Sequence, residues 1–197
     1  MNNVSLLFPD YYCHFQNLPI NNKELIKHLQ DIEYNKTFSS KGCYTSNTYD
    51  FLKTIDKNYE EVFVDYIQKG FDELGIKSNF KIARSWITKV TPDSESEYHN
   101  HANYFMSAVY YPMGAQDNSI NFRKTLPTLW DVETSDNFLH YQTQTVLISA
   151  GDLILFPSHL LHRVNFNSTN TNRYSIAMNI QPTGVIGTFD SKYEFST

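Results

Sequence analysis

The amino-acid sequence predicts an α+β fold in which two helices precede a β-sheet that is folded into a sandwich or barrel. Apolar residues recur at helical spacing in the first part of the chain, and short runs rich in β-branched and aromatic residues follow from Asn79 onward. Clusters of Asp, Asn, Ser, Pro and Gly separate these runs. We expect a single domain over 1–197, with a helical supporting part at 1–78, a β-rich core at 79–182 and a C-terminal tail at 183–197.

Two segments of the supporting part, at 21–34 and 58–75, have the pattern of amphipathic helices. In each segment the apolar residues fall on one side of a helix, which leaves the polar residues for solvent. Gly75, which follows the second apolar face, is typical of a helix end. The two apolar faces consist of Leu25, Ile26 and Leu29 in the first segment and of Val62, Phe63, Tyr66, Ile67 and Phe71 in the second.

Seven runs in the β-rich core are typical of strands, because β-branched and aromatic side chains favour pleated surfaces. The 14 Tyr and 14 Phe of the chain add to this tendency. Turn-forming residues bound each run, so we expect short strands joined by loops. The runs cover 80–90, 104–111, 119–122, 143–149, 152–156, 161–166 and 173–180.

Charge and composition argue against several partners. The formal net charge is −5 and Lys and Arg form no cluster, which argues against nucleic acid and anionic membranes as partners. No stretch approaches the ~18 apolar residues of a membrane span, and the first residues lack the pattern of a signal peptide. Cys13 and Cys43 match neither a disulfide framework nor a zinc finger, so we expect free thiols in a reducing compartment. These observations predict a cytoplasmic enzyme.

Three histidines of the β-rich core form a candidate metal site. His99 and His101 make an H-x-H pair before the run at 104–111, and alternate residues of an extended segment point the same way. His162, at the start of the run at 161–166, offers a third imidazole. Taken singly, such residues are more often surface histidines or histidines bound to the backbone, and their joint placement favours a metal. Imidazole binds iron, zinc, copper and nickel, so residue type alone does not choose the ion.

A candidate carboxylate site follows the last of these histidines. In the run at 173–180 bulky apolar residues alternate with small or polar ones, which is typical of a strand with one face on a core. Arg173 and Ser175 fall on the second face, toward the interior of a small barrel. A guanidinium binds a carboxylate through two parallel hydrogen bonds, and a nearby hydroxyl can add a third.

Several blocks of the sequence resemble the 2-oxoglutarate- and Fe(II)-dependent oxygenase superfamily, most closely a group of uncharacterised members from bacteria and phages. The resemblance implies a double-stranded β-helix, that is, a jelly-roll or cupin-like barrel over 79–182, with the N-terminal helices packed on its outside. It also implies Fe(II) as the metal and 2-oxoglutarate as the co-substrate. The blocks that carry it are LLFPDYY, SWITKV, HNHANYFMSAVYYP, GDLILFPSHLLHRV and NRYSIAMNI.

The resemblance assigns roles to individual residues. His99 corresponds to the proximal histidine of the superfamily, His162 to the distal histidine, and Arg173 to the residue that binds the far carboxylate of 2-oxoglutarate. Tyr111 matches a position that touches the same carboxylate in some relatives, and Ser175 would assist Arg173. No catalytic residue is expected beyond the metal ligands. Trp86 and Ser107 are the expected walls of the pocket.

Position 101 departs from the superfamily, because most members have Asp or Glu where this chain has His101. Three neutral imidazoles would leave the metal more positively charged than two imidazoles and a carboxylate. Glu97 or Asp93 could still supply a carboxylate, and His159 could take the place of His162, although the spacing to the following arginine favours His162.

The predicted function is that of a 2-oxoglutarate- and Fe(II)-dependent dioxygenase, specifically a hydroxylase, that uses dioxygen and a small molecule or a protein side chain as substrates. One alternative is a three-histidine dioxygenase of the cupin type that does not use 2-oxoglutarate. Another is a barrel that binds metal without catalysis. An unrelated β-sandwich recognition domain would keep the three histidines apart.

Overall fold

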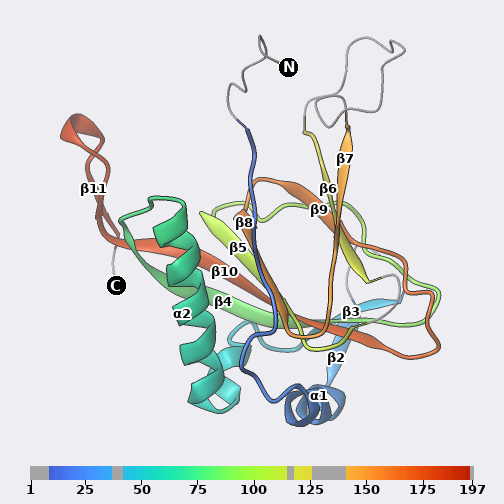
Figure 1. The fold of residues 1–197 in the computed structure, drawn as a ribbon. Helices are drawn as coiled ribbons and strands as arrows, with labels where there is room; N and C mark the ends of the chain where they lie inside the picture. The colour runs from blue at the N-terminus through green and yellow to red at the C-terminus, as the bar shows by residue number, and fades with distance from the viewer. Residues whose placement is uncertain (1–8, 37–41, 115–117, 126–140, 196–197) are drawn as a thin grey trace, which may run out of the picture.

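Two antiparallel sheets and two α-helices build the part of the chain that the computed structural model describes, namely residues 9–36, 42–114, 118–125 and 141–195 (Figure 1). The helices are α1 (Asn22–Gln30) and α2 (Lys57–Glu73), with short 3-10 helices η1 (Phe51–Thr54) and η3 (Phe189–Ser191). Within these described residues, no helix combines the length and the apolar character that crossing a membrane requires.

The strands divide into a large sheet and a small one. The large sheet has the order β1-β8-β5-β10-β4-β3-β2, with β11 beside β10, and the small sheet has the order β7-β6-β9. The large sheet comprises β1 (Cys13–Phe15), β2 (Tyr34–Lys36), β3 (Cys43–Ser46), β4 (Asn79–Val90), β5 (Met106–Tyr111), β8 (Asp152–Pro157), β10 (Arg173–Ile186) and β11 (Tyr193–Phe195). The small sheet comprises β6 (Ser119–Arg123), β7 (Thr143–Leu147) and β9 (Leu161–Val164).

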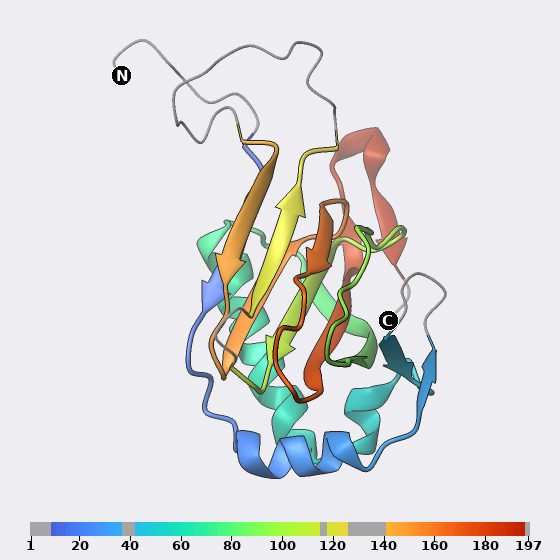
Figure 2. The same ribbon diagram turned by 90° about the vertical axis from the view of Figure 1, so that its right-hand side faces the viewer.

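All seven predicted strand runs form strands, and their connections define a jelly roll. From β5 onward the chain passes to the small sheet for β6 and β7, returns to the large sheet for β8, crosses for β9 and returns for β10. Figure 2 shows β6 in yellow and β7 in orange in front of the large sheet, with α2 behind it. This arrangement of two facing antiparallel sheets confirms the predicted double-stranded β-helix.

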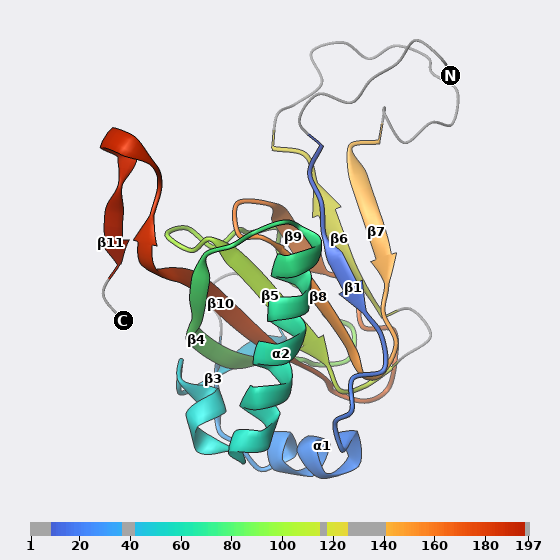
Figure 3. The same cartoon turned by 60° about the vertical axis from the view of Figure 1, so that its left-hand side comes forward.

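Both predicted helices form; α2 packs on the outer face of the large sheet, whereas α1 lies at one end of that sheet, as Figure 3 shows. Asn21 caps α1 by accepting a hydrogen bond from the backbone of Glu24, and Asp56 caps α2 in the same way. Gly75 ends α2 with a φ of 70°, a conformation that glycine adopts without strain. The buried helix residues that join the core of the large sheet are Leu25, Leu29, Phe63, Ile67 and Phe71.

Two features of the fold lie outside the sequence expectations. The supporting part also contributes three short strands, of which β1 pairs with β8 and β3 pairs with β4. The chain after residue 182 continues β10 to Ile186 and then pairs it with β11, so the segment grouped as a tail contains a hairpin. Both cysteines are buried, and neither forms a disulfide, which agrees with the prediction of thiols.

Strand β10 separates an apolar layer from a layer that contains polar groups. Its bulky residues face the helices and belong to the main core, whereas Ala177 belongs to the second core between the two sheets. Because side chains alternate along a strand, Arg173, Ser175 and Asn179 share the face of Ala177. The predicted alternation of 173–180 is therefore confirmed, and it brings three polar side chains to the interior of the barrel.

Candidate metal centre

The loop that carries His99 and His101 is held against strand β9 by backbone hydrogen bonds. The amide of His99 donates to the carbonyl of His162 at 3.0 Å, and the amide of His162 donates back to His99 at 2.9 Å. The amide of His101 donates to the carbonyl of Ser158 at 2.9 Å. The loop thus acts as a short irregular strand, and this pairing places two histidines from distant parts of the sequence opposite each other.

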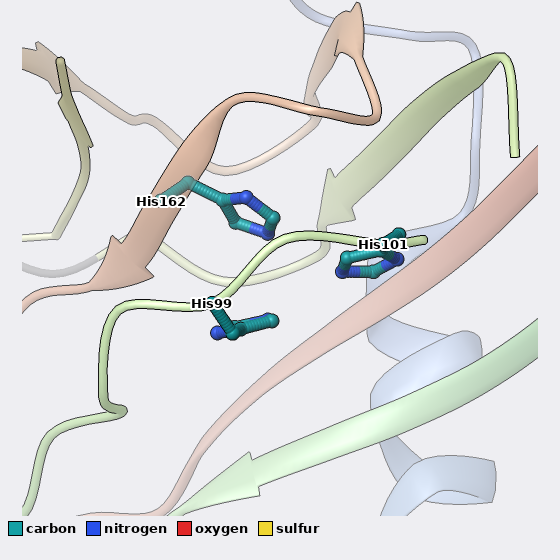
Figure 4. Close-up of side chains that lie close together, drawn as sticks. All are labelled: His99, His101 and His162. Carbon is teal, nitrogen blue, oxygen red and sulfur yellow. The ribbon is translucent and has the colours of Figure 1, made fainter. Parts of the chain in front are cut away.

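The three histidine side chains meet at one point between this loop and β9 (Figure 4). Their candidate ligand nitrogens all lie within 4.8 Å of one another. The ring centroids of His99 and His162 are 4.4 Å apart, and that of His101 lies 5.1 Å from His162. His162 is buried, His101 is partly buried and His99 is exposed, so the cluster opens to solvent on one side. The convergence argues against an unrelated recognition domain.

In each of the three imidazoles the Nδ1 atom is hydrogen-bonded to an oxygen acceptor. Nδ1 of His99 donates to the carbonyl of Glu97 at 2.9 Å, and Nδ1 of His162 donates to the carbonyl of Leu160 at 2.9 Å. Nδ1 of His101 lies 2.5 Å from the side-chain oxygen of Asn179. Since a carbonyl oxygen only accepts, the proton of each neutral ring resides on Nδ1 and the lone pair on Nε2. A metal ion requires such a free lone pair from each histidine that binds it.

Burial keeps the two inner imidazoles neutral. The pKa of His101 is lowered to about 4, chiefly by burial; the bond to Asn179 opposes this shift, and the neighbouring His99 adds a smaller lowering. Burial also lowers the pKa of His162 well below its ordinary value, with smaller contributions from His99 and His101. The neutral ring is the form that binds a metal, so protons compete weakly for this site at neutral pH.

The alternative ligands considered from the sequence lie elsewhere. Among the described residues, neither Glu97 nor Asp93 contributes to the cluster of potential metal ligands, and both are exposed. His159 is exposed and lies 3.5 Å from the carboxylate of Asp10. The donor set is therefore three imidazole nitrogens, a combination that suits first-row transition metals such as iron, nickel and zinc.

Aromatic side chains surround the histidines on their inner side. Trp86 stacks on His101 with ring centroids 5.3 Å apart and an interplanar angle of 27°. Phe156 contacts His162 edge to face at 4.7 Å, and Phe122 lies 6.4 Å from the same ring. Trp86 thus lies beside the cluster, where the sequence analysis expected a wall. These rings keep water from the inner side of the imidazoles.

A second polar group occurs at the start of β10, where Arg173 is buried at 5% exposure. Its guanidinium donates to the backbone carbonyl of Asn165, but its Nε has no acceptor among the described residues. The hydroxyl of Tyr111 is buried and equally lacks a partner there. Burial raises the pKa of Tyr111 while the positive charge of Arg173 opposes this, so the phenol remains protonated beside a cation.

No carboxylate within the described chain forms an ion pair with Arg173. A buried cation without a counterion is costly, as is a buried polar atom without a hydrogen bond. Ser175, 6% exposed, shares the inner face of β10 with Arg173. The arrangement can therefore accept a carboxylate, which would pair with the guanidinium and with the hydroxyl of Tyr111.

Two polar residues near His101 have roles that the sequence did not predict. Ser107, an expected wall of the pocket, has its hydroxyl 2.8 Å from that of Ser158, and it donates to the side-chain oxygen of Asn179 at 3.1 Å. Asn179 was placed on the inner face of its strand but was given no function. Its contact with His101 joins residues 78 positions apart, which sequence alternation alone does not reveal.

Comparison with known proteins agrees with this fold and site. A family model described as "Putative 2OG-Fe(II) oxygenase" matches residues 84–179, a segment that contains the three histidines and Arg173. No curated protein sequence matches the chain.

Three solved structures illustrate the similarity of fold. The first is HygX from Streptomyces hygroscopicus with nickel and 2-oxoglutarate bound, which has 12% identity, a TM-score of 0.60 and coverage of 88% of this chain and 84% of that one. The epimerase SnoN from nogalamycin biosynthesis has 13% identity and a TM-score of 0.66 over 89% and 80%. A Pseudomonas putida prolyl-4-hydroxylase has 14% identity and a TM-score of 0.58 over 89% and 94%.

The chain is thus similar to the 2OG-Fe(II) oxygenases over residues 84–179, and it shares the fold of these solved structures.

Proposed function

We propose that this protein is a hydroxylase that binds Fe(II) through Nε2 of His99, His101 and His162 and uses 2-oxoglutarate as co-substrate. One observation carries the proposal. Each imidazole has its Nδ1 bonded to an oxygen acceptor, and all three candidate ligand groups lie within 4.8 Å of one another. Histidines that bind metals almost always have this second hydrogen bond, because it fixes the tautomer and the orientation of the ring.

The ligand set suits an anionic co-substrate. Three neutral imidazoles leave the full charge of a divalent cation uncompensated, and a carboxylate of 2-oxoglutarate would reduce that charge. The far carboxylate of the co-substrate would be held by Arg173, with Tyr111 and Ser175 as additional donors. Support comes from the Nε of Arg173 and the hydroxyl of Tyr111, both buried and without a hydrogen-bond partner among the residues that the structure describes.

With iron and 2-oxoglutarate bound, the site would supply the oxidising power to insert one oxygen atom of dioxygen into a C–H bond, with formation of succinate and carbon dioxide. The residues of this chain would do three things. The histidines would leave part of the coordination sphere open, Arg173 would orient the co-substrate, and Trp86 and Phe156 would exclude water. The exposed side of His99 is the side from which a substrate could approach.

The substrate we propose is a small molecule or a protein side chain. HygX has been crystallised with hygromycin B bound, and SnoN in complex with nogalamycin RO, so barrels of this fold accept small molecules. We further propose that residues 1–197 form one domain and that the protein acts in the cytoplasm. Support for one domain comes from the core that α1 and α2 share with the large sheet, and from the pairing of β1 with β8 of that sheet.

Anaerobic titration of the metal-free protein with Fe(II) and then 2-oxoglutarate tests the proposal. We expect a weak visible charge-transfer band that forms only when both are present, disappears in His162→Ala and weakens in Arg173→Ala. His159→Ala, which removes an exposed histidine outside the cluster, should leave the band unchanged. Stoichiometric iron binding without a band would contradict the use of 2-oxoglutarate.

A three-histidine dioxygenase that does not use 2-oxoglutarate is the second candidate, because the cluster has no carboxylate among its ligand groups. It predicts oxygen consumption that depends on iron and substrate but not on 2-oxoglutarate. A barrel that binds metal without catalysis predicts no oxygen consumption with any substrate. The oxygen electrode therefore separates both from the proposed function once the titration has been done.

A further inference from the structure

The three histidines of the metal site have their Nδ1 atoms held in two different ways. For His99 and His162 the acceptor is a backbone carbonyl two residues earlier, that of Glu97 and of Leu160. Such an acceptor is local and does not depend on the identity of any other side chain. For His101 the acceptor is the side chain of Asn179, which comes from strand β10.

His101 does not use the local backbone acceptor. The carbonyl two residues before it belongs to His99, and this carbonyl accepts the amide of His162 at 2.9 Å in the pairing of the loop with β9. The Nδ1 of His101 lies instead 2.5 Å from the side-chain oxygen of Asn179.

Asn179 is itself fixed by a buried network. Its side-chain oxygen also accepts the hydroxyl of Ser107 at 3.1 Å, and Ser107 lies 2.8 Å from the hydroxyl of Ser158. Asn179, Ser107 and Ser158 are all buried. An amide oxygen has two acceptor sites, and His101 and Ser107 fill both. In this arrangement the side-chain oxygen of Asn179, and not its nitrogen, faces His101.

We propose that Asn179 is the positioning residue of His101, a role that rests on the proposed metal site. Asn179 accepts the Nδ1 proton, fixes the ring and keeps the lone pair of Nε2 directed at the metal. In this way it allows an imidazole to act where most of the superfamily has a carboxylate. A reversed amide would place its NH₂ group against His101, which would move the ring proton to Nε2 and block the ligand atom.

The test measures Zn(II) affinity by calorimetry in wild type and in three variants. Asn179→Leu keeps the size but removes the acceptor, and we expect its affinity to fall by roughly 10- to 100-fold. Asn179→Asp keeps an oxygen at the same place and should retain affinity within about threefold. Asn121→Leu is the matched control, because Asn121 is a buried amide on β6 that bonds to Thr145 and not to a histidine.

A second measurement does not depend on metal. Long-range ¹H–¹⁵N correlation spectra of the metal-free protein report which ring nitrogen of His101 carries the proton. We expect the Nδ1–H form in wild type and a shift toward the Nε2–H form in Asn179→Leu. If Asn179→Leu fails to fold, as judged by thermal unfolding, Asn179→Asp and Asn179→Ser carry the comparison, with affinity kept in the first and reduced in the second.

The possible failures are distinct. Wild type that binds no Zn(II) would overturn the proposed metal site itself. Wild type that binds Zn(II), together with a folded Asn179→Leu of equal affinity, would overturn only the role of Asn179. An Nε2–H tautomer of His101 in wild type would overturn it as well, because the amide would then present its nitrogen.

Discussion

The inner face of β10 has polar groups at both ends, and the two ends differ in how many of these groups have hydrogen-bond partners within the described protein. At one end Asn179 accepts hydrogen bonds from His101 and from Ser107. At the other end the Nε of Arg173 and the hydroxyl of Tyr111 are buried without partners in the described chain. The first end is organised without a ligand, whereas the second end would be completed by the proposed carboxylate.

The difference has a physical reason. A metal requires neutral ligands in a fixed orientation, and hydrogen bonds within the protein can provide both in advance. A carboxylate brings its own charge and acceptors, so the groups that receive it must be left unpaired until it binds. The comparison predicts that changes at the two ends affect different ligands.

The largest effect is expected from His162→Ala. His162 is the most buried of the three histidines, and its loss removes one of three ligands. We expect affinity for Fe(II) or Zn(II) to fall by more than about 100-fold, beyond the effect of losing a hydrogen-bond partner of a ligand. Competition with a chelating dye measures the metal affinity of the variant. Equal loss in the control His159→Ala would show that the effect is not specific to the cluster.

Acid should destabilise the metal-free protein through His101, which lies at the Asn179 end of β10. The pKa of His101 is about 4 in the folded protein and about 6.5 in the unfolded chain. Below pH 6.5 the unfolded chain therefore binds a proton that the folded protein does not, and stability falls as the pH decreases toward 4. The contribution of His101 is about 3 kcal/mol over this range.

Urea unfolding at pH 7 and pH 4.5 in the presence of a chelator measures the acid effect. His101→Gln should lose less stability on acidification than wild type does, because it lacks this titrating group. Burial lowers the pKa of His162 too, so the variant should keep part of the dependence. The same pH dependence in both proteins would show that His101 titrates normally.

At the other end, Arg173→Met should weaken the binding of 2-oxoglutarate and leave the binding of the metal unchanged. A hydrogen bond to a charged group contributes about 1.5–3 kcal/mol, which corresponds to a loss of affinity of about 10- to 150-fold. Zn(II) affinity should remain that of wild type. Arg84→Met is the matched control, because Arg84 is half exposed and lies 3.6 Å from Asp50. If Arg173→Met weakened metal binding as strongly as co-substrate binding, the two ends of the strand would not serve different ligands.

Tyr111→Phe should give the smallest change, with opposite signs in two measurements. Removal of a buried hydroxyl without a partner should raise the stability of the ligand-free protein by about 1 kcal/mol. The affinity for 2-oxoglutarate should fall by about 2- to 10-fold, because a neutral hydrogen bond contributes about 0.5–1.5 kcal/mol. Thermal unfolding and calorimetry measure the two effects. A loss of stability without co-substrate would mean that the hydroxyl already has a partner.

The sequence predicted most of the barrel because its strands are long enough to show alternation and composition. Strand β10 is the clearest example, since the alternation of 173–180 correctly assigned each side chain to a face. Strands β1, β2 and β3 have only three or four residues, too few for a pattern to emerge. Tertiary pairing with β8 and β4, and not local preference, gives them their form.

The sequence predicted the histidines of the candidate site but not the residues that hold them in place. The H-x-H spacing implied that two imidazoles could share a target, and the structure brings His162 to the same place. The network of Asn179 and Ser107 was not predictable, because its members come from separate strands and meet only when the sheet has formed. Likewise, the absence of an acceptor for the Nε of Arg173 within the described chain is a property of the folded interior, not of the local sequence.

A crystal structure with Zn(II) and 2-oxoglutarate bound tests the central claim most directly, and anomalous scattering would locate the metal. We expect Zn(II) at about 2.0–2.1 Å from Nε2 of His99, His101 and His162. We also expect a carboxylate of 2-oxoglutarate against Arg173 and the hydroxyl of Tyr111. Zn(II) bound through Nδ1 atoms or through Glu97, or 2-oxoglutarate bound away from Arg173, would contradict this claim.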